Sequence, residues 1–233
     1  MRFTVPMLDG SLVRRYKRFL ADVRLGNGRL VTVHCPNPGS MLGLAEQGWR
    51  VLLSDSGTAT GRKLRFTWEA VRVGRSWVIV NTLRANQVAG EALRTGLIAE
   101  LADLTHVEPE VRVSERSRID FRLSSPGSTR PCYVEVKSVT LREDGVALFP
   151  DAVTLRGRRH LEELALLRRR ARAVMLFLVM RADCRELAPA DAIDPEYGRA
   201  LRRVTGSGVE VLAYDVHVSR NGATVGDRLP VRL

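Results

Sequence analysis

The chain has 233 residues, of which 45% are hydrophobic and 27% charged, and its formal net charge is +11 at pH 7. The longest unbroken apolar run, 173–180, is too short to cross a bilayer, and the first residues hold no apolar signal region. These features argue against a membrane protein, and we expect a protein of the cytoplasm. The three cysteines are widely spaced and match neither a zinc pattern nor a disulfide framework.

The positive charge is concentrated in the first third of the chain. Residues 1–82 carry 13 Lys and Arg against 5 Asp and Glu, whereas residues 83–233 carry 24 against 21. A compositional bias toward Arg (34 Arg, 3 Lys) explains the choice of basic residue but not the scarcity of acids in one segment. A polyanion, with nucleic acid as the first candidate, is therefore the expected partner.

Residues 1–82 show the pattern of a small all-β domain. Alternating apolar residues and Gly-containing turns predict two hairpins and one further strand, namely 19–25 with 29–35, 63–73 with 76–81, and 49–55. Five short strands without a helical pattern favour a closed OB-like barrel, a fold that commonly binds nucleic acid on one face. The pattern leaves an SH3-like barrel open.

Residues 83–233 predict an α/β domain, so that the whole chain is α+β. Hydrophobic spacing predicts the order αβββαβ followed by αβ, with helices at 85–101, 153–170 and about 195–205 and strands at 110–115, 117–123, 132–141, 173–180 and 209–216. The path from strand 132–141 through a helix to strand 173–180 is a βαβ crossover, so these two strands are expected to be parallel. We place the domain boundary near residue 82.

Three charged residues fall in the middle of this predicted sheet. Glu135 and Lys137 are two residues apart, so their side chains share one face of the strand. An antiparallel pairing with the preceding strand brings Asp120 beside Glu135. Two neighbouring carboxylates repel each other unless a cation lies between them, and Mg²⁺, or Mn²⁺ in its place, is the natural occupant, with the carbonyl of Val136 as a further ligand. Lys137 then orients or activates a water.

The alternative is a solvated strand on which Glu135 and Lys137 form an ordinary surface pair. Three observations favour the metal site. The predicted helix 85–101 lies just upstream and supplies Glu91 and Glu100 as further acids. Asp120 lies on the strand that a hairpin places next door, and Lys137 is one of only 3 Lys among 37 basic residues. A compact ammonium retained in such a composition indicates a task that a planar guanidinium does not perform.

An acid followed by (D/E)-x-K on the next strand, within an αβββαβ core, resembles the PD-(D/E)xK nuclease-like superfamily, which holds Mg²⁺ with these residues and hydrolyses phosphodiesters. Ile119 stands here where the motif's proline is expected. The whole chain further resembles the sugar fermentation stimulation protein family. This resemblance rests on "RYKRFLADV" (15–23), "HCPNPGSMLG" (34–43), "NTLRAN" (81–86), "SRIDF" (117–121), "CYVEVKSVTL" (132–141), "FPDAVTLRGRRHLEEL" (149–164) and "GVEVLAY" (208–214).

The resemblance implies an N-terminal OB-like domain, a restriction-endonuclease-like C-terminal domain and largely sequence-independent DNA binding. It assigns Asp120 and Glu135 as metal ligands and Lys137 as the catalytic lysine. Glu91 is the preferred additional ligand from the first helix, although a surface salt bridge is an equal alternative for it. The family pattern is "HCPNTG", and Pro38 takes the Thr position here, which favours a structured turn.

Several further residues are candidates for binding. Arg15, Lys17 and Arg18, with Tyr16 interleaved, are expected to pair phosphate contacts with base stacking, and an exposed strand face is the alternative. Arg156, Arg158 and Arg159 begin a helix beside the proposed site and are candidate phosphate clamps, with an ordinary basic helix surface as the alternative. His34 and Asn37 are possible polar residues at the domain junction.

Three functions remain open at this point. The first is a DNA-binding protein with an Mg²⁺-dependent nuclease site. The second is a DNA-binding regulator of sugar (maltose) metabolism in which the nuclease-like domain serves binding alone. The complete set of Asp120, Glu135 and Lys137 argues for the first, because a decayed site is expected to lose one of them. A protein directed at RNA is the third, since an OB-like barrel does not itself choose between DNA and RNA.

Overall fold

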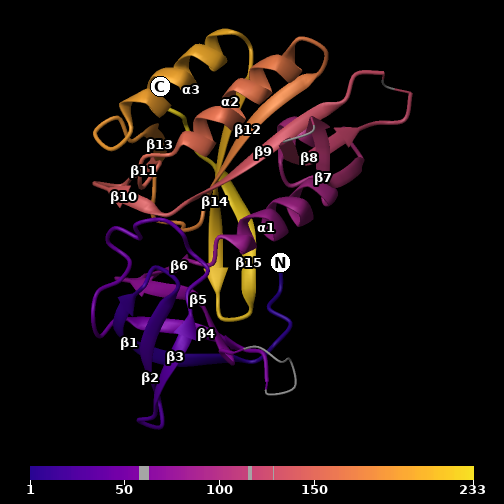
Figure 1. Cartoon of the computed structure of the whole chain (residues 1–233). Helices are drawn as coiled ribbons and strands as arrows, with labels where there is room; N and C mark the ends of the chain where they lie inside the picture. The colour runs from indigo at the N-terminus through magenta and orange to yellow at the C-terminus, as the bar shows by residue number, and fades with distance from the viewer. Residues whose placement is uncertain (58–62, 115–116, 128) are drawn as a thin grey trace.

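The computed structural model of the chain describes residues 1–57, 63–114, 117–127 and 129–233 (Figure 1). These residues form a β-barrel at the N-terminal end and a larger layered α/β unit above it. No helix in this part of the chain is long and apolar enough to cross a membrane.

The N-terminal unit is a barrel closed by five strands. Its described residues include six strands, of which the first five form the ring: β1 (Met7–Tyr16), β2 (Leu20–Leu25), β3 (Leu30–His34), β4 (Arg50–Asp55), β5 (Phe66–Val73) and β6 (Ser76–Ile79). They pair in the order β3-β2-β1-β4-β5-β6, and a β3–β5 bridge between His34 and Thr67 closes the first five into a ring. The predicted hairpins β2–β3 and β5–β6 are therefore confirmed, as is the closed barrel.

The prediction missed β1 and counted β6 as a barrel strand in its place. Asp9 and Gly10 interrupt the apolar alternation of β1, which hid this strand from pattern analysis. Gly10 has a packing reason, since a Cβ added there would lie 2.3 Å from a methyl group of Val23 on β2. The interior is filled by Leu12, Leu53 and fully buried Trp68.

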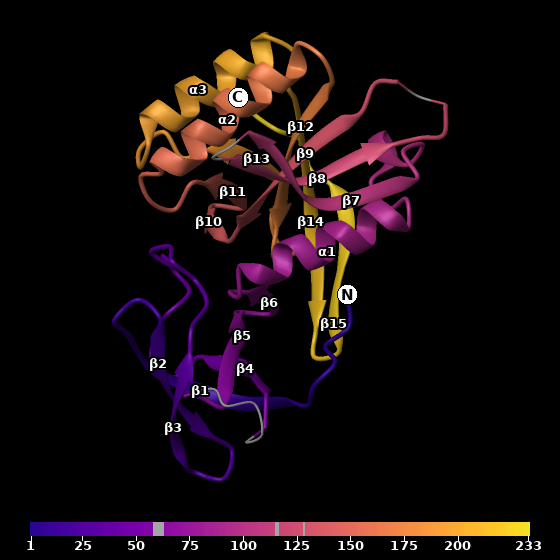
Figure 2. The ribbon, with the colours of Figure 1, turned by 45° about the vertical axis from the view of Figure 1, so that its right-hand side comes forward.

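The C-terminal unit has three layers, with α1 on one face of a six-stranded sheet and α2 and α3 on the other (Figure 2). The sheet order is β15-β14-β12-β9-β8-β7. Its main elements are α1 (Leu83–Arg94), β7 (His106–Ser114), β8 (Ser117–Ser124), β9 (Cys132–Val139), α2 (Leu155–Arg168), β12 (Arg172–Val179), α3 (Pro195–Gly206), β14 (Glu210–Ser219) and β15 (Gly222–Arg228). The β9–β12 pair is parallel, as the crossover predicted.

The structure departs from the predicted elements in two respects. The first helix ends at Arg94 rather than at residue 101, because Gly96 takes the left-handed conformation (φ 70°) and only a short 3-10 turn, Ala99–Leu101, follows. Four strands were not predicted: β15 and the small sheet of β10 (Leu141–Glu143), β11 (Val146–Phe149) and β13 (Glu186–Pro189). The strands of the small sheet have only three or four residues each, too few to show a period.

The two units are joined by contacts at several places along their boundary. The β14–β15 hairpin extends alongside the barrel in both views (Figures 1 and 2), and the Ile79 amide donates to the Met180 carbonyl at 3.0 Å. Arg84 of α1 forms an ion pair with buried Glu69 of β5 at 2.7 Å. On another side, the Ser40 hydroxyl donates to the backbone carbonyl of Asp151 at 2.7 Å. These contacts fix the barrel against the α/β unit and define the walls of a shared pocket.

Candidate metal and nucleic-acid site

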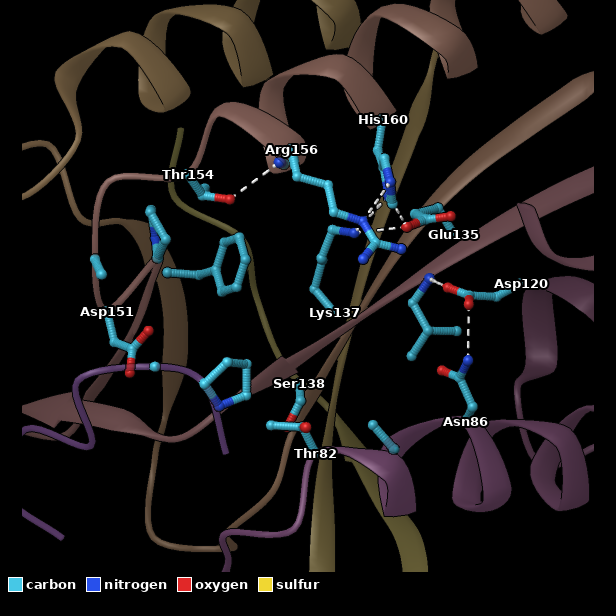
Figure 3. Close-up of a pocket in the computed structure, with 18 of the residues that line it drawn as sticks. Thr82, Asn86, Asp120, Glu135, Lys137, Ser138, Asp151, Thr154, Arg156 and His160 are labelled. Atoms are coloured by element: carbon cyan, nitrogen blue, oxygen red, sulfur yellow. Dashed lines mark hydrogen bonds and ion pairs between the residues drawn. The ribbon is translucent and has the colours of Figure 1, made fainter. Parts of the chain in front are cut away.

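A pocket of about 1180 Å³ lies between the barrel and the α/β unit. Its walls come from the 37–39 loop of the barrel, the first turn of α1, strands β8 and β9, the 148–154 segment and the start of α2. Asp120, Glu135 and Lys137 all line it, so the structure brings together the three residues that the sequence singled out (Figure 3).

Asp120 lies where β8 separates from β9. The paired register ends at Phe121 with Val134, and the Val136 amide donates instead to Oδ2 of Asp120 at 2.8 Å. The other oxygen, Oδ1, accepts from the side-chain amide of Asn86 on α1 at 2.7 Å. Since the N–H and C=O of one residue leave the same edge of a strand, the carbonyl of Val136 faces this same opening.

Glu135 projects from the opposite side of the strand to Val134 and Val136, toward α2, and its side chain is 2% exposed. Its Oε1 accepts from Nζ of Lys137 at 2.6 Å and contacts Nδ1 of His160 on α2. Nε of Arg156 donates to Nε2 of His160 at 3.3 Å. Nζ of Lys137 also lies 3.0 Å from Nδ1, so the imidazole is held between Glu135, Lys137 and Arg156.

The two carboxyl groups have opposite pKa shifts. Burial opposes ionisation of Glu135, but the hydrogen bond and charge of His160, together with the charge of Lys137, outweigh it and lower the pKa of Glu135. The pKa of Asp120 is raised, first by burial and then by the negative charge of Glu135. A positive charge placed between the two carboxylates would relieve this repulsion.

The donor set fits a hard divalent cation. Oε2 of Glu135 is buried and receives no hydrogen bond from any described residue, although a carboxylate oxygen normally accepts at least one. With Oδ2 of Asp120 and the Val136 carbonyl nearby, the opening presents oxygen atoms from three residues, the ligand type that Mg²⁺, Mn²⁺ and Ca²⁺ prefer.

Glu91, the predicted ligand from the first helix, lies elsewhere. Its carboxylate pairs with the amino group of Met1 at 2.6 Å, is 53% exposed and does not line the pocket. Glu100, the other acid considered, accepts from the hydroxyl of Tyr214. This placement removes both from the ligand set, and the residue that α1 contributes is the neutral Asn86.

The predicted binding residues of the barrel fall into two groups. Arg15 donates to the carbonyls of Asn37, Gly39 and Ser40, so it organises the 37–40 loop and has its guanidinium engaged within the chain. The Tyr16 hydroxyl donates to Asp22 at 3.0 Å and its ring lies under Arg14. Both side chains are thus held by contacts within the barrel, and neither lines the pocket.

Lys17 and Arg18 lie in a tight turn between β1 and β2 rather than on a strand, and both have positive φ. Their side chains are exposed and, within the described part of the chain, make no hydrogen bond or ion pair. They remain candidates for phosphate contacts, but they do not line the pocket.

Of the two residues proposed for the domain junction, one lines the pocket and the other does not. Asn37 is 3% exposed and lines the pocket. Its side-chain amide donates to the Val80 carbonyl and accepts from the Gly39 amide. It holds the wall of the pocket in shape. His34 is exposed at the end of β3 and does not line the pocket, so the structure does not place it at the junction site.

Of the three helix arginines, Arg156 and Arg159 line the pocket, whereas Arg158 points toward Glu196 on α3 at 4.0 Å. The sequence did not single out His160, Asn86 or Arg118 as site residues. Arg118 lines the pocket and, like Arg159, makes no hydrogen bond or ion pair within the described residues. The signal for His160 was its place one helical turn after Arg156, on the face of α2 that meets β9.

Comparison with known proteins agrees with this architecture. The family model "SfsA N-terminal OB domain" matches residues 13–80, and "Sugar fermentation stimulation protein RE domain" matches residues 83–222. Sugar fermentation stimulation protein homologs from Geotalea uraniireducens and Pelobacter propionicus are 48% and 52% identical, covering 100% and 98% of both chains. The structure of Pyrococcus furiosus SfsA in complex with Ca²⁺ matches with a TM-score of 0.89 and 25% identity, over 100% of this chain and 98% of that one. The chain therefore belongs to the sugar fermentation stimulation protein family, as the sequence motifs predicted.

Proposed function

We propose that this protein is a divalent-metal-dependent nuclease that binds nucleic acid with little sequence preference. The observation that carries the proposal is the group of buried Glu135 with half-buried Asp120 and Lys137, in a pocket that also holds two arginines without side-chain partners among the described residues. The Pyrococcus furiosus relative was solved with Ca²⁺, a cation of the class that this oxygen-rich site favours.

Asp120, Glu135 and the carbonyl of Val136 would hold Mg²⁺, with Mn²⁺ as an alternative. When bound, the ion supplies Lewis-acid stabilisation of the negative charge that develops on the phosphate. Asn86 and the Val136 amide fix the two oxygens of Asp120, and His160 with Lys137 fixes Oε1 of Glu135. Both carboxylates are thereby held in place before any substrate arrives.

Lys137 has three N–H donors, of which one is used by Glu135, and Nδ1 of His160 is a further neighbour at 3.0 Å. The remaining donors are available to a phosphate oxygen or to the attacking water, and the ammonium opposes negative charge that accumulates there. Arg118 and Arg159 line the same pocket and are free to pair with phosphates on either side of the reacting one.

The expected substrate is DNA, bound largely through its phosphates, and RNA is an alternative. Basic side chains without fixed partners recognise the backbone and carry no base readout. The second candidate from the sequence, a regulator that only binds, predicts the same affinity without turnover, so cleavage decides between the two.

The first prediction is that cleavage depends on both the metal and Asp120. Wild-type protein with Mg²⁺ or Mn²⁺ is expected to cut single- or double-stranded DNA or RNA, and EDTA is expected to stop it. Asp120→Asn should reduce the rate by at least about 10²-fold, because the neutral amide no longer neutralises the cation. The measurement is the rate of product formation from labelled oligonucleotides on a denaturing gel.

Glu91→Gln is the matched control, an acid-to-amide change outside the pocket, and it should cut at the wild-type rate. Absence of cleavage by the wild type with every metal and substrate would sink the nuclease proposal. Equal loss of activity in Glu91→Gln and Asp120→Asn would show that the ligand set is wrong.

The second prediction concerns salt. Because binding to phosphates releases counterions, the logarithm of the affinity should fall linearly with the logarithm of salt concentration. Arg118→Ala and Arg159→Ala should each reduce the slope of this line by about one. Arg158→Ala, on the same helix as Arg159 but turned toward Glu196, should leave the slope unchanged. Fluorescence anisotropy over a salt series measures the slopes, and an affinity independent of salt contradicts this mode of binding.

A further inference from the structure

Three aliphatic side chains that line the pocket or lie next to its lining are more exposed than any other large hydrophobic residue in the described part of the chain. They are Leu83, Val153 and Leu155, which are 69%, 67% and 66% exposed. Leu83 and Val153 line the pocket, and Leu155 follows two residues after Val153. We call these three residues the apolar rim.

The apolar rim lies where two helices begin. Leu83 is the first residue of α1 and Leu155 the first of α2. Thr82 and Thr154, which directly precede them, lie on different sides of the pocket (Figure 3). The rim therefore borders the opening from two elements rather than forming one contiguous stretch of chain.

The threonines next to the apolar rim stabilise the fold through hydrogen bonds, whereas the three rim side chains have no such role. Thr154 caps α2 by accepting from the Gly157 amide, and Thr82 bonds to the Pro36 carbonyl through both its amide and its hydroxyl. The three aliphatic side chains bury little of their own surface, so they contribute little to stability. A concentration of exposed apolar surface beside a charged pocket marks a place of interaction.

Both rim segments are held in position by the same barrel loop. Thr82 is tied to Pro36, and Asp151 accepts from the Ser40 hydroxyl and, through Oδ2, from the Met41 amide at 3.2 Å. Gly39 lies so close to Asp151 that an added Cβ would come within 2.4 Å of its carboxylate. The rim is thus presented on a fixed frame, which lowers the entropy lost when a ligand packs against it.

We propose that the apolar rim packs against unstacked bases of a single-stranded nucleic-acid segment whose phosphates lie in the pocket. This inference deepens the proposed function and rests on its claim that the pocket binds a phosphodiester. The distribution of chemistry matches such a strand: Lys137, Arg118 and Arg159 lie within the pocket, and the exposed aliphatic side chains line it or lie next to its lining. A duplex hides its base faces by stacking and presents only phosphates and groove edges, so it offers the rim nothing apolar to contact. The substrate class is therefore single strands, or duplex ends and flaps with unpaired bases.

The test measures binding in EDTA, so that strands stay intact. The probes are a labelled single strand and a blunt duplex of the same sequence, and the variant is the double substitution Leu83→Gln with Val153→Thr. The variant is expected to bind the single strand at least about fivefold more weakly, as for loss of base contacts, and the duplex as the wild type does. Leu166→Gln is the control, since Leu166 is 61% exposed on α2 but outside the pocket. A 2-aminopurine base in the single strand should brighten on binding wild type, because unstacking relieves its quenching, and less so on binding the variant.

Three results would overturn the inference. They are unchanged single-strand affinity of the double variant, equal weakening for strand and duplex, and a change in oligomeric state by sedimentation with affinity unchanged. The last result would make the rim an interface between copies of this chain. All substituted side chains are exposed, so the thermal midpoint of the variant should match the wild type and binding should report on the rim. Because the readout needs no turnover, a wild type that never cuts but shows the strand-specific loss would refute the nuclease and leave the inference standing.

Discussion

Lys137→Ala is expected to reduce metal-dependent cleavage by at least about 10²-fold while nucleic-acid binding changes little. Nζ of Lys137 lies 2.6 Å from Glu135 and 3.0 Å from Nδ1 of His160, and the side chain is only 13% exposed. In the proposed mechanism the ammonium acts at the reacting phosphate, whereas affinity would come from many phosphate contacts of which Lys137 supplies at most one. The loss should appear in the turnover rate rather than in the substrate concentration needed for half-maximal rate.

Replacing Lys137 by arginine tests whether the site needs the shape of the ammonium as well as its charge. Lys137→Arg keeps the charge but puts a planar, larger guanidinium into a space bounded by Glu135 and His160, and it should lose most of the activity as well. Lys63→Ala removes one of the other two lysines from an exposed position on the barrel and should cut normally. Single-turnover rates with saturating Mn²⁺ or Mg²⁺ provide the comparison. If Lys137→Ala cut at the wild-type rate, the assigned role of this lysine would be wrong.

The pairing of Asp120 with the Glu135 strand could be predicted because it depends on short-range rules. Strand parity fixes which side chains share a face, and an antiparallel hairpin brings consecutive strands together. The prediction that Val134 and Val136 enter the core opposite Glu135 was correct for the same reason. What parity did not reveal is that β8 leaves β9 at Asp120, so that a carboxylate rather than a backbone carbonyl accepts from Val136.

Residues that reach the site from helices were harder to predict. The face that a helix turns to a strand depends on packing between elements far apart in sequence, and His160 contacts a residue 25 positions away. Glu91 is the opposite case, a helix residue that was predicted to lie at the site and lies outside the pocket. Val88 and Ala92 are among the buried residues of α1, whereas Glu91 lies on the exposed side of the helix and pairs with Met1.

Arg15 shows why a local charge pattern misleads. In sequence it belongs to a basic run with an interleaved tyrosine, which is typical of phosphate and base contacts. In the structure its guanidinium is spent on three backbone carbonyls of the 37–40 loop. That loop forms a wall of the pocket, so Arg15 supports the site from behind. A sequence does not indicate which cations are consumed by buried carbonyls, because those partners come together only on folding.

Arg84→Ala is expected to destabilise the protein by about 3–5 kcal/mol, because it leaves a buried carboxylate without its cation. Glu69 is 1% exposed and accepts two hydrogen bonds from Arg84, with Ser54 and Asn81 as neutral donors. Arg84 belongs to α1 and Glu69 to the barrel, so the pair also joins the two units. At about 2–4 °C per kcal/mol for a chain of this size, the thermal midpoint should fall by roughly 10 °C.

Lowering the pH should narrow the difference in unfolding free energy between the wild type and Arg84→Ala. Burial opposes ionisation of Glu69, but the hydrogen bonds and charge of Arg84 outweigh it, so its pKa lies below the ordinary 4.5. A carboxyl with a lowered pKa in the folded state stabilises the fold above about pH 4.5, and this contribution disappears as the pH falls through the folded pKa. Without Arg84 the carboxyl is buried and unpaired, so its protonation favours the variant fold. The wild type should therefore lose stability in acid faster than the variant does.

A double-mutant cycle separates two energies: the interaction between Glu69 and Arg84, and the cost of leaving a buried carboxylate unpaired. Glu69→Gln combined with Arg84→Ala should be more stable than Arg84→Ala alone, because no buried charge remains unpaired. Arg202→Ala breaks the exposed pair with Asp191 and should cost no more than about 1 kcal/mol. Urea unfolding of the four proteins of the cycle and of Arg202→Ala measures these differences. If Arg84→Ala were no more destabilising than Arg202→Ala, the Glu69–Arg84 contact would not hold the two units together, and the pocket between them would owe its shape to the other contacts, such as Ser40–Asp151 and Ile79–Met180.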